Sequence, residues 1–126
     1  VSDLMLRGSA LPLCRPQDKL VDTLVELSNK KCGCVLVVDH DHHMLGIFTD
    51  GDLRRALQKN GSKCLDQPMQ ELMIISPRTI GPNQLAWDAM KLMESDPKHP
   101  ITVLPVIDNE KAVGLIKLHD IVQSGL

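Results

Sequence analysis

A pattern of apolar strand, tight turn and helix occurs twice in this chain and constrains its fold more than any other feature. The first copy reads GIFTDGDLRRAL from Gly46, and the second reads GLIKLHDIV from Gly114. In each copy a glycine opens a short apolar run, and an aspartate, Asp52 or Asp120, follows near the predicted start of a helix. The recurrence predicts two structurally equivalent halves.

The polar residues at the first of these turns have two interpretations. Thr49, Asp50 and Asp52 lie where a strand passes into a helix, and the unpaired backbone N–H groups of a helix start attract anions or polyol oxygens. Thr49 and Asp52 also have the spacing of a capping box, in which each side chain bonds the other residue's backbone. The spacing alone leaves both interpretations open.

Composition limits the class of partner. The chain has 126 residues, is 43% hydrophobic and carries a formal net charge of −2, with Phe48 and Trp87 as its aromatic residues. Nucleic-acid binding, which needs a basic face or aromatic stacking platforms, is therefore not expected. The sequence contains neither an apolar run of 18 residues nor a signal peptide, so we expect a cytoplasmic protein without a membrane partner. Cys32 and Cys34 are separated by one glycine, and we expect reduced thiols.

Periodicity predicts the same order of elements, β-α-β-β-α, in both halves. We expect a helix from an Asp18 cap to about residue 29, strands at 34–39 and 45–49, and a helix from about Asp52 to Gly61. In the second half Asn83 is the expected helix cap, and Pro105 requires an edge or irregular position in its strand. The halves are residues 1–61 and 69–126, joined by a polar connector at 62–68. Because the chain starts at Val1 rather than at a methionine, we expect a fragment of a longer protein.

Together the halves resemble a tandem pair of CBS domains, named after cystathionine β-synthase. The resemblance rests on VSDLM and MQELM at the starts of the halves, on the helices after Pro16 and Pro82, and on GIFTDGD and GLIKLHD. It implies an α+β fold of two β-α-β-β-α repeats related by a pseudo-twofold axis, with adenine nucleotides or related ligands in the clefts. The run GIFTDGDLRRAL, with LHDIVQSGL at the end, resembles the regulatory region of isomerases that make D-arabinose 5-phosphate. Those enzymes carry their catalysis in an N-terminal sugar isomerase domain.

The resemblance also implies residue roles. In the first repeat the Asp52 carboxylate would accept ribose hydroxyls, the Thr49 hydroxyl and the helix start at Asp50 would hold a phosphate, and the backbone of Gly33 and Cys34 would border the base. The second repeat offers Lys117, His119 and Asp120 at the matching places. Lys117 stands where the family often has Thr or Ser, so we expect the two pockets to differ.

Other clusters indicate no chemistry of their own. His40, His42 and His43 lie beside Asp39 and Asp41 and have the side chains of a Zn²⁺ or Ni²⁺ site, but a solvated hairpin loop is the favoured interpretation, and no metal is expected.

His119 and Asp120 lack an accompanying nucleophile, so no catalytic residue is predicted. Arg54 and Arg55 are expected on the outer side of their helix, as solvated charges or as groups that reach a phosphate.

We therefore expect a regulatory module that requires no cofactor and binds an adenine nucleotide or CMP-Kdo. The second ligand follows from pathway logic, since arabinose 5-phosphate leads to Kdo, an acidic sugar of bacterial and plant envelopes. The expected partners are the N-terminal isomerase domain of the same chain and a second copy, in a homodimer. Two alternatives stay open: a dimerisation module that binds no ligand, and a metal-dependent enzyme that uses the His cluster.

Overall fold

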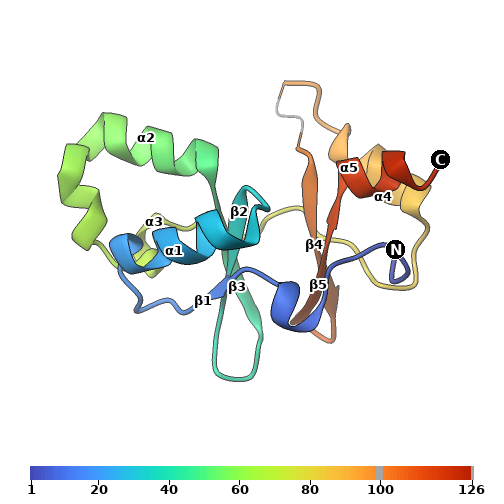
Figure 1. Cartoon of the computed structure of the whole chain (residues 1–126), viewed down its shortest axis with the longest axis horizontal. Coiled ribbons are helices and arrows are strands. Elements are labelled where there is room, and N and C mark those ends of the chain that lie inside the picture. Colours follow the sequence, from blue (N-terminus) through green and yellow to red (C-terminus); the bar gives the residue numbers. More distant parts are fainter. Residues whose placement is uncertain (99–100, 126) are drawn as a thin grey trace. The chain divides into compact units, whose positions relative to one another are not determined.

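The computed structural model describes residues 1–98 and 101–125, which form two compact units (Figure 1). The central unit is Pro12–Pro77, and the terminal unit combines Val1–Leu11 with Arg78–Leu126. Both contain strands that lead into helices, as the repeated pattern predicts.

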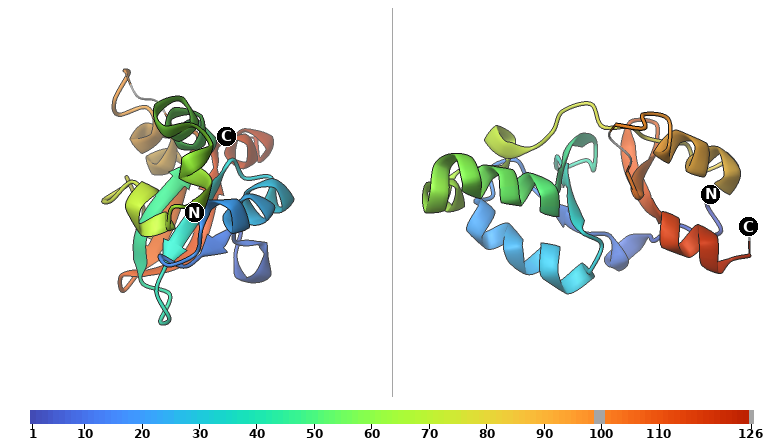
Figure 2. Two further views of the ribbon diagram at one scale, coloured as in Figure 1. Left: turned by 90° about the vertical axis from the view of Figure 1, so that its left-hand side faces the viewer. Right: turned by 90° about the horizontal axis from the view of Figure 1, so that it is seen from above.

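The central unit is a three-stranded sheet with two long helices on one of its faces (Figure 2). Its strands are β1 (Leu13–Cys14), β2 (Cys34–Val38) and β3 (Met44–Thr49), and its main helices are α1 (Leu20–Lys30) and α2 (Asp50–Asn60). Strand β1 runs parallel to β2, and β2 runs antiparallel to β3. Every residue of β2 is buried, as expected for the continuous apolar run in the middle of the sheet. Leu20 and Leu27 of α1 share one core with Val35, Val37 and Phe48 of the strands.

The chain beyond α2 belongs to the central unit as well. The segment expected to be a polar connector forms the 3-10 helix η2 (Gly61–Asp66), followed by the short helix α3 (Met69–Leu72). Cys64 and Met69 are fully buried in the core of the central unit, which explains why this segment does not act as a free linker. Ile74 then pairs with Ile47 on the edge of β3, with N–O distances of 3.0 and 2.8 Å.

The terminal unit, which includes the start of the chain, repeats the helices and the strand hairpin of this arrangement. The predicted first strand of the second half is not formed, because Ile80 makes only an isolated parallel bridge with Val106. The unit contains the 3-10 helix η1 (Gly8–Ala10), strands β4 (Val103–Asp108) and β5 (Lys111–Lys117), and helices α4 (Ala86–Met93) and α5 (Leu118–Gln123). Leu6 pairs with Leu115 of β5, with N–O distances of 2.8 and 3.1 Å, as Ile74 pairs with Ile47 in the central unit. The compact units therefore differ from the sequence repeats at 1–61 and 69–126, because the opening segment of each repeat packs on the strands of the other.

The two repeated glycines lie where these opening segments cross the strands. A Cβ atom on Gly46 would come within 2.8 Å of the Ile74 carbonyl oxygen, and one on Gly114 within 3.0 Å of the Leu6 carbonyl oxygen. Only a residue without a side chain allows the backbones to approach this closely.

Two helix starts differ from those expected. Helix α1 begins at Leu20 rather than directly after Asp18, whose carboxylate accepts the Arg15 N–H at 2.9 Å. Helix α4 begins at Ala86 rather than after Asn83, and the Asp88 carboxylate accepts the Leu85 N–H at 3.2 Å. At both sites a carboxylate accepts a backbone N–H: Asp18 does so from the segment before α1, and Asp88 from within the first turn of α4.

Pro105 lies in β4, within a two-stranded sheet and one residue before an irregularity in the register, as its missing N–H requires. The four cysteines are free and buried, which agrees with reduced thiols. Burial, with the nearby Asp18 and Glu26 carboxylates, raises the pKa of the Cys14 thiol to about 12. Within the described ranges, no helix has the length and apolar character needed to cross a membrane.

Gly46→Ala is expected to lower the free energy of unfolding by about 1–3 kcal/mol, because the new methyl group meets a backbone oxygen that cannot turn away. Urea denaturation measures the change. Gly81→Ala is the matched control, since its Cβ meets no heavy atom within 4 Å. Equal stability of the two variants would contradict the close crossing of Ile74 over β3.

Candidate functional site

The start of helix α2 is the place where most of the expected site residues meet. Thr49 ends β3 and pairs with Cys34 at the start of β2. The N–H of Asp50 donates to the Gly33 carbonyl oxygen at 3.0 Å, which joins the loop after α1 to the first turn of α2. Cys34 is fully buried, and its place in the site is therefore limited to its backbone.

Thr49 and Asp52 form the capping box that their spacing allows. The Thr49 N–H donates to Asp52 Oδ2 at 2.9 Å, and the Asp52 N–H donates to Thr49 Oγ1 at 3.2 Å. The Thr49 hydroxyl in turn donates to Asp52 Oδ2 at 2.9 Å. The structure thus contains the capping box that the sequence allows. These hydrogen bonds fix the direction in which α2 leaves the sheet.

The other oxygen of the Asp52 carboxylate is bonded to Arg55. The Arg55 Nη2 atom lies 2.5 Å from Asp52 Oδ1, so the Arg55 side chain, which is exposed as the sequence predicts, also reaches back along the helix to Asp52. Gly51 makes room for it, because a Cβ there would lie 3.3 Å from the guanidinium. The Arg55 side chain is 67% exposed while that of Asp52 is 9% exposed, so the guanidinium keeps donors available to a ligand.

Asp52 and Arg55 line a cavity of about 280 Å³, which we call the Asp52 pocket. Its walls are α2 on one side and the η2–α3 segment with Ile74 on the other. The lining residues are Asp52, Arg55, Ala56, Lys59, Asn60, Gln67, Glu71, Leu72 and Ile74.

Asp50 and Gly33 line a different cavity, of about 740 Å³, which we call the Gly33 pocket. It lies between the end of α1 and the start of α2, and its other lining residues are Leu24, Leu27, Ser28, Lys31, Cys32 and Leu53. The structure therefore separates Asp50 from Asp52, although the two are neighbours in the motif, because their side chains leave α2 toward different cavities. Thr49 and Cys34 line neither of these two pockets.

In the terminal unit the matching residues surround the start of α5. Lys117 precedes the helix without a side-chain cap, His119 is exposed, and Asp120 is half-buried in the first turn. The capping box of the central unit is not repeated here, because Lys117 has no oxygen to accept an N–H. The two helix starts are therefore unequal in structure, as their sequences predict.

Sequence reasoning missed the second wall of the Asp52 pocket. Lys59 and Asn60 share a helix face with Asp52, and their spacing could have identified them. Gln67 and Glu71 reach the pocket only through the packing of η2 and α3 on the central core, for which the sequence has no local signal.

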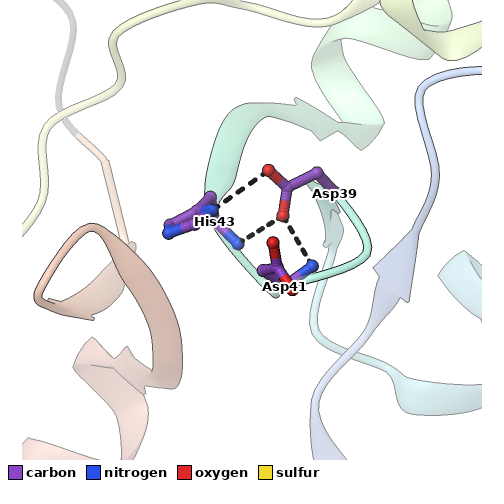
Figure 3. A group of neighbouring side chains, drawn as sticks. All are labelled: Asp39, Asp41 and His43. Carbon is purple, nitrogen blue, oxygen red and sulfur yellow. Dashed lines mark hydrogen bonds and ion pairs between the residues drawn. The ribbon is translucent and has the colours of Figure 1, made fainter.

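The acidic and histidine-rich segment forms the tight turn between β2 and β3 (Figure 3). Asp39 Oδ1 accepts the N–H groups of Asp41 and His43 at 2.9 Å each, and Asp39 Oδ2 lies 3.1 Å from His43 Nδ1. The hydrogen bond from the His43 backbone is the main reason why the pKa of the Asp39 carboxyl is below its ordinary value. Potential ligand atoms of Asp39, Asp41 and His43 lie within 4.8 Å of one another, and the turn itself accounts for that proximity.

Thr49→Ala is expected to lower the free energy of unfolding by about 1 kcal/mol, the usual effect of a lost helix cap. Thr49→Ser is the control and should retain most of the stability, because it keeps the oxygen that accepts the Asp52 N–H. Thermal or urea unfolding compares the variants. A serine variant as unstable as the alanine variant would show that the hydroxyl does not stabilise the helix start.

Comparison with known proteins places this architecture in a family. Residues 1–59 and 69–125 each match the family model of the CBS domain. The whole chain is 39% identical to an uncharacterised protein of Chlamydia pneumoniae and 36% identical to the arabinose 5-phosphate isomerase KdsD of Yersinia pestis, of which it spans 39% and 37% of the length, respectively.

This chain is also similar to a crystal structure of the Arabidopsis thaliana protein CBSX2 in complex with AMP. It superposes with a TM-score of 0.81 at 27% identity, over 98% of this chain and 93% of that one. The chain is thus an α+β protein of two strand-and-helix repeats, and it belongs to the CBS domain family as a tandem pair.

Proposed function

We propose that this chain is the ligand-sensing regulatory module of a sugar-phosphate isomerase of the arabinose 5-phosphate type, in the biosynthesis of Kdo. The main support for the proposal is the alignment with KdsD, which covers the entire length of this chain and 37% of the length of KdsD. A CBS pair is non-catalytic alone, so catalysis belongs to an N-terminal sugar isomerase domain of the parent chain. On this proposal the parent enzyme works in the cytoplasm.

Two observations support a nucleotide or nucleotide-sugar as the ligand. CBSX2, with which the chain shares its fold at 27% identity, is described in complex with AMP. The Asp52 pocket combines cations that can bind a phosphate with carboxylates and amides that can bind hydroxyls. An adenine nucleotide or CMP-Kdo would therefore act as an effector, with no cofactor required.

Ligand binding is tested by thermal unfolding with AMP, ADP, ATP, CMP and CMP-Kdo. At about 100 times its dissociation constant, a ligand of the folded state stabilises the protein by roughly 2.7 kcal/mol. We expect at least one of these compounds to raise the melting temperature of the wild type, and Asp52→Asn to remove that rise. Asp22→Asn, an exposed position on α1, should leave it unchanged. If none of the compounds shifts the wild type, the sensing function is wrong.

A second candidate function is assembly of the isomerase without a ligand. Val21 and Val25 lie one turn apart on α1, and their side chains are 43% and 63% exposed. Together they form an exposed apolar surface on α1 that a second copy of this chain could cover. The capping box gives Thr49 and Asp52 a purely structural role on this view. The two functions are compatible, because a homodimer can also bind an effector.

Light scattering at a protein concentration on the order of tens of micromolar should give the mass of a dimer. Val25→Glu should shift the protein to the monomer, because it buries an unpaired charge in the contact. Asn29→Glu adds the same charge at an exposed polar position of α1 and should leave the dimer intact. A wild type that is monomeric, or a Val25 variant that still dimerises, would contradict an interface on this stripe.

A further inference from the structure

The last residue of helix α2 is an asparagine followed by a glycine, a pair with a chemical reactivity of its own. Asn60 ends α2, and Gly61 begins η2. An asparagine side chain reacts slowly with the backbone nitrogen of the next residue, which is one reason why asparagine is thermally labile. The reaction is fastest when that residue is glycine, because no side chain then shields the nitrogen or restricts its approach.

Asn60 is the only one of the four asparagines in the chain that precedes a glycine. The other three, at positions 29, 83 and 109, precede lysine, glutamine and glutamate, respectively. All four asparagines are exposed. They therefore form an internal comparison in which access to water is shared and the following residue differs.

The fold holds the reacting groups of this pair weakly. The side-chain nitrogen of Asn60 donates to Gln67 Oε1 across 3.5 Å, which is longer than an ordinary hydrogen bond. The Gly61 N–H donates to the Leu57 carbonyl oxygen at the end of α2. Gly61 has a φ of 60°, and a Cβ atom there would meet no heavy atom within 4 Å. The space beside the attacking nitrogen is therefore open.

A rotation of the Asn60 backbone separates the folded geometry from the reactive one. Its ψ is −2°, so the Gly61 nitrogen eclipses the Asn60 nitrogen and is turned away from Cβ. Ring closure needs that nitrogen beside the side chain, and the rotation breaks the bond from Gly61 to Leu57. Helix ends fray, so this bond opens more readily than those in the middle of α2. The fold therefore slows the reaction without preventing it.

We propose that Asn60 is a site of spontaneous deamidation. In the opened turn the Gly61 nitrogen loses its proton and attacks Cγ of Asn60, so that a C–N bond forms and ammonia leaves. Water then adds to one of the two carbonyl carbons of the cyclic imide and breaks its bond to the nitrogen. The product at position 60 is aspartate or isoaspartate, according to which carbonyl carbon the water attacks.

The product adds a negative charge to the end of α2 and to the wall of the Asp52 pocket. Asn60 lies at the C-terminal end of the helix, where the helix dipole is already negative. Among the residues that line the pocket, Arg55 and Lys59 balance Asp52 and Glu71 in charge. A third carboxylate makes the pocket acidic and weakens its attraction for a phosphate. This consequence rests on the proposed sensing function, and it makes the response to an anionic effector decline as the protein ages.

Peptide mapping by mass spectrometry tests the reaction itself on the intact, folded chain during prolonged incubation. We expect the peptide that contains Asn60 to acquire the mass of the carboxylate product at least tenfold faster than the peptides with the other three asparagines. The rate should rise with pH, because the attacking nitrogen must lose a proton. Asn60→Gln should stay unmodified at this position over the same time, since its longer side chain closes a ring less readily.

Calorimetric titration with AMP tests the consequence for the pocket. Asn60→Asp carries the charge of the product, whereas Asn60→Gln keeps an amide, and we expect AMP to bind the aspartate variant at least threefold more weakly than the glutamine variant. Asn83→Asp is the matched control, because it adds the same charge at an exposed position that does not line the pocket. It should bind AMP as the wild type does.

Two results would overturn the proposal. Mass gain at Asn60 no faster than at the other asparagines would show that the fold suppresses the reaction. Equal AMP affinity of Asn60→Asp and Asn60→Gln would show that the modification does not act on the pocket. If the wild type binds no AMP, the effect on an AMP effector fails with the sensing function, and the mass gain alone decides whether Asn60 is modified.

Discussion

The capping box between Thr49 and Asp52 connects the sheet of the central unit to its candidate site. Thr49 is held by strand pairing with Cys34, and its hydroxyl and N–H are bonded to Asp52. This network sets the direction of α2, and with it the face that carries Arg55 and Lys59. Binding chemistry and helix capping are therefore not competing explanations, because the cap positions the groups that would contact the ligand.

The opening segment of the second repeat is the other structural requirement of the site. By pairing with Ile47, Ile74 fixes the chain that follows η2 and α3 along the edge of β3. The buried side chain of Met69 holds the same segment in the core. Gln67 and Glu71 are thereby brought opposite α2. The Asp52 pocket therefore combines residues of the first repeat with Gln67 of the connector and Glu71 of the second repeat.

Local patterns in the sequence predicted much of this fold. Alternating and continuous apolar runs identified the main strands, and the Gly to Asp pattern identified the repeats and the capping box at Thr49. Other features depend on contacts between distant residues. The helix start at Ala86 instead of Asn83, the return of Arg55 onto Asp52, and the contribution of Gln67 and Glu71 all follow from packing that no short stretch encodes. The sequence motif also did not predict that Asp50 and Asp52 line different pockets, although helical residues two positions apart face different directions.

Nuclear magnetic resonance of the amide-labelled chain during titration with AMP tests the central claim most directly, because it reports where binding occurs. The account predicts that the largest and saturable shifts fall on the face of α2 from Asp52 to Asn60 and on the facing wall from Gln67 to Ile74. Inorganic phosphate at the same concentration should produce a weaker response at these residues. Saturable shifts confined to other parts of the chain would contradict the account. The absence of shifts at millimolar ligand would also contradict it, because a millimolar dissociation constant corresponds to a binding free energy of only about −4 kcal/mol.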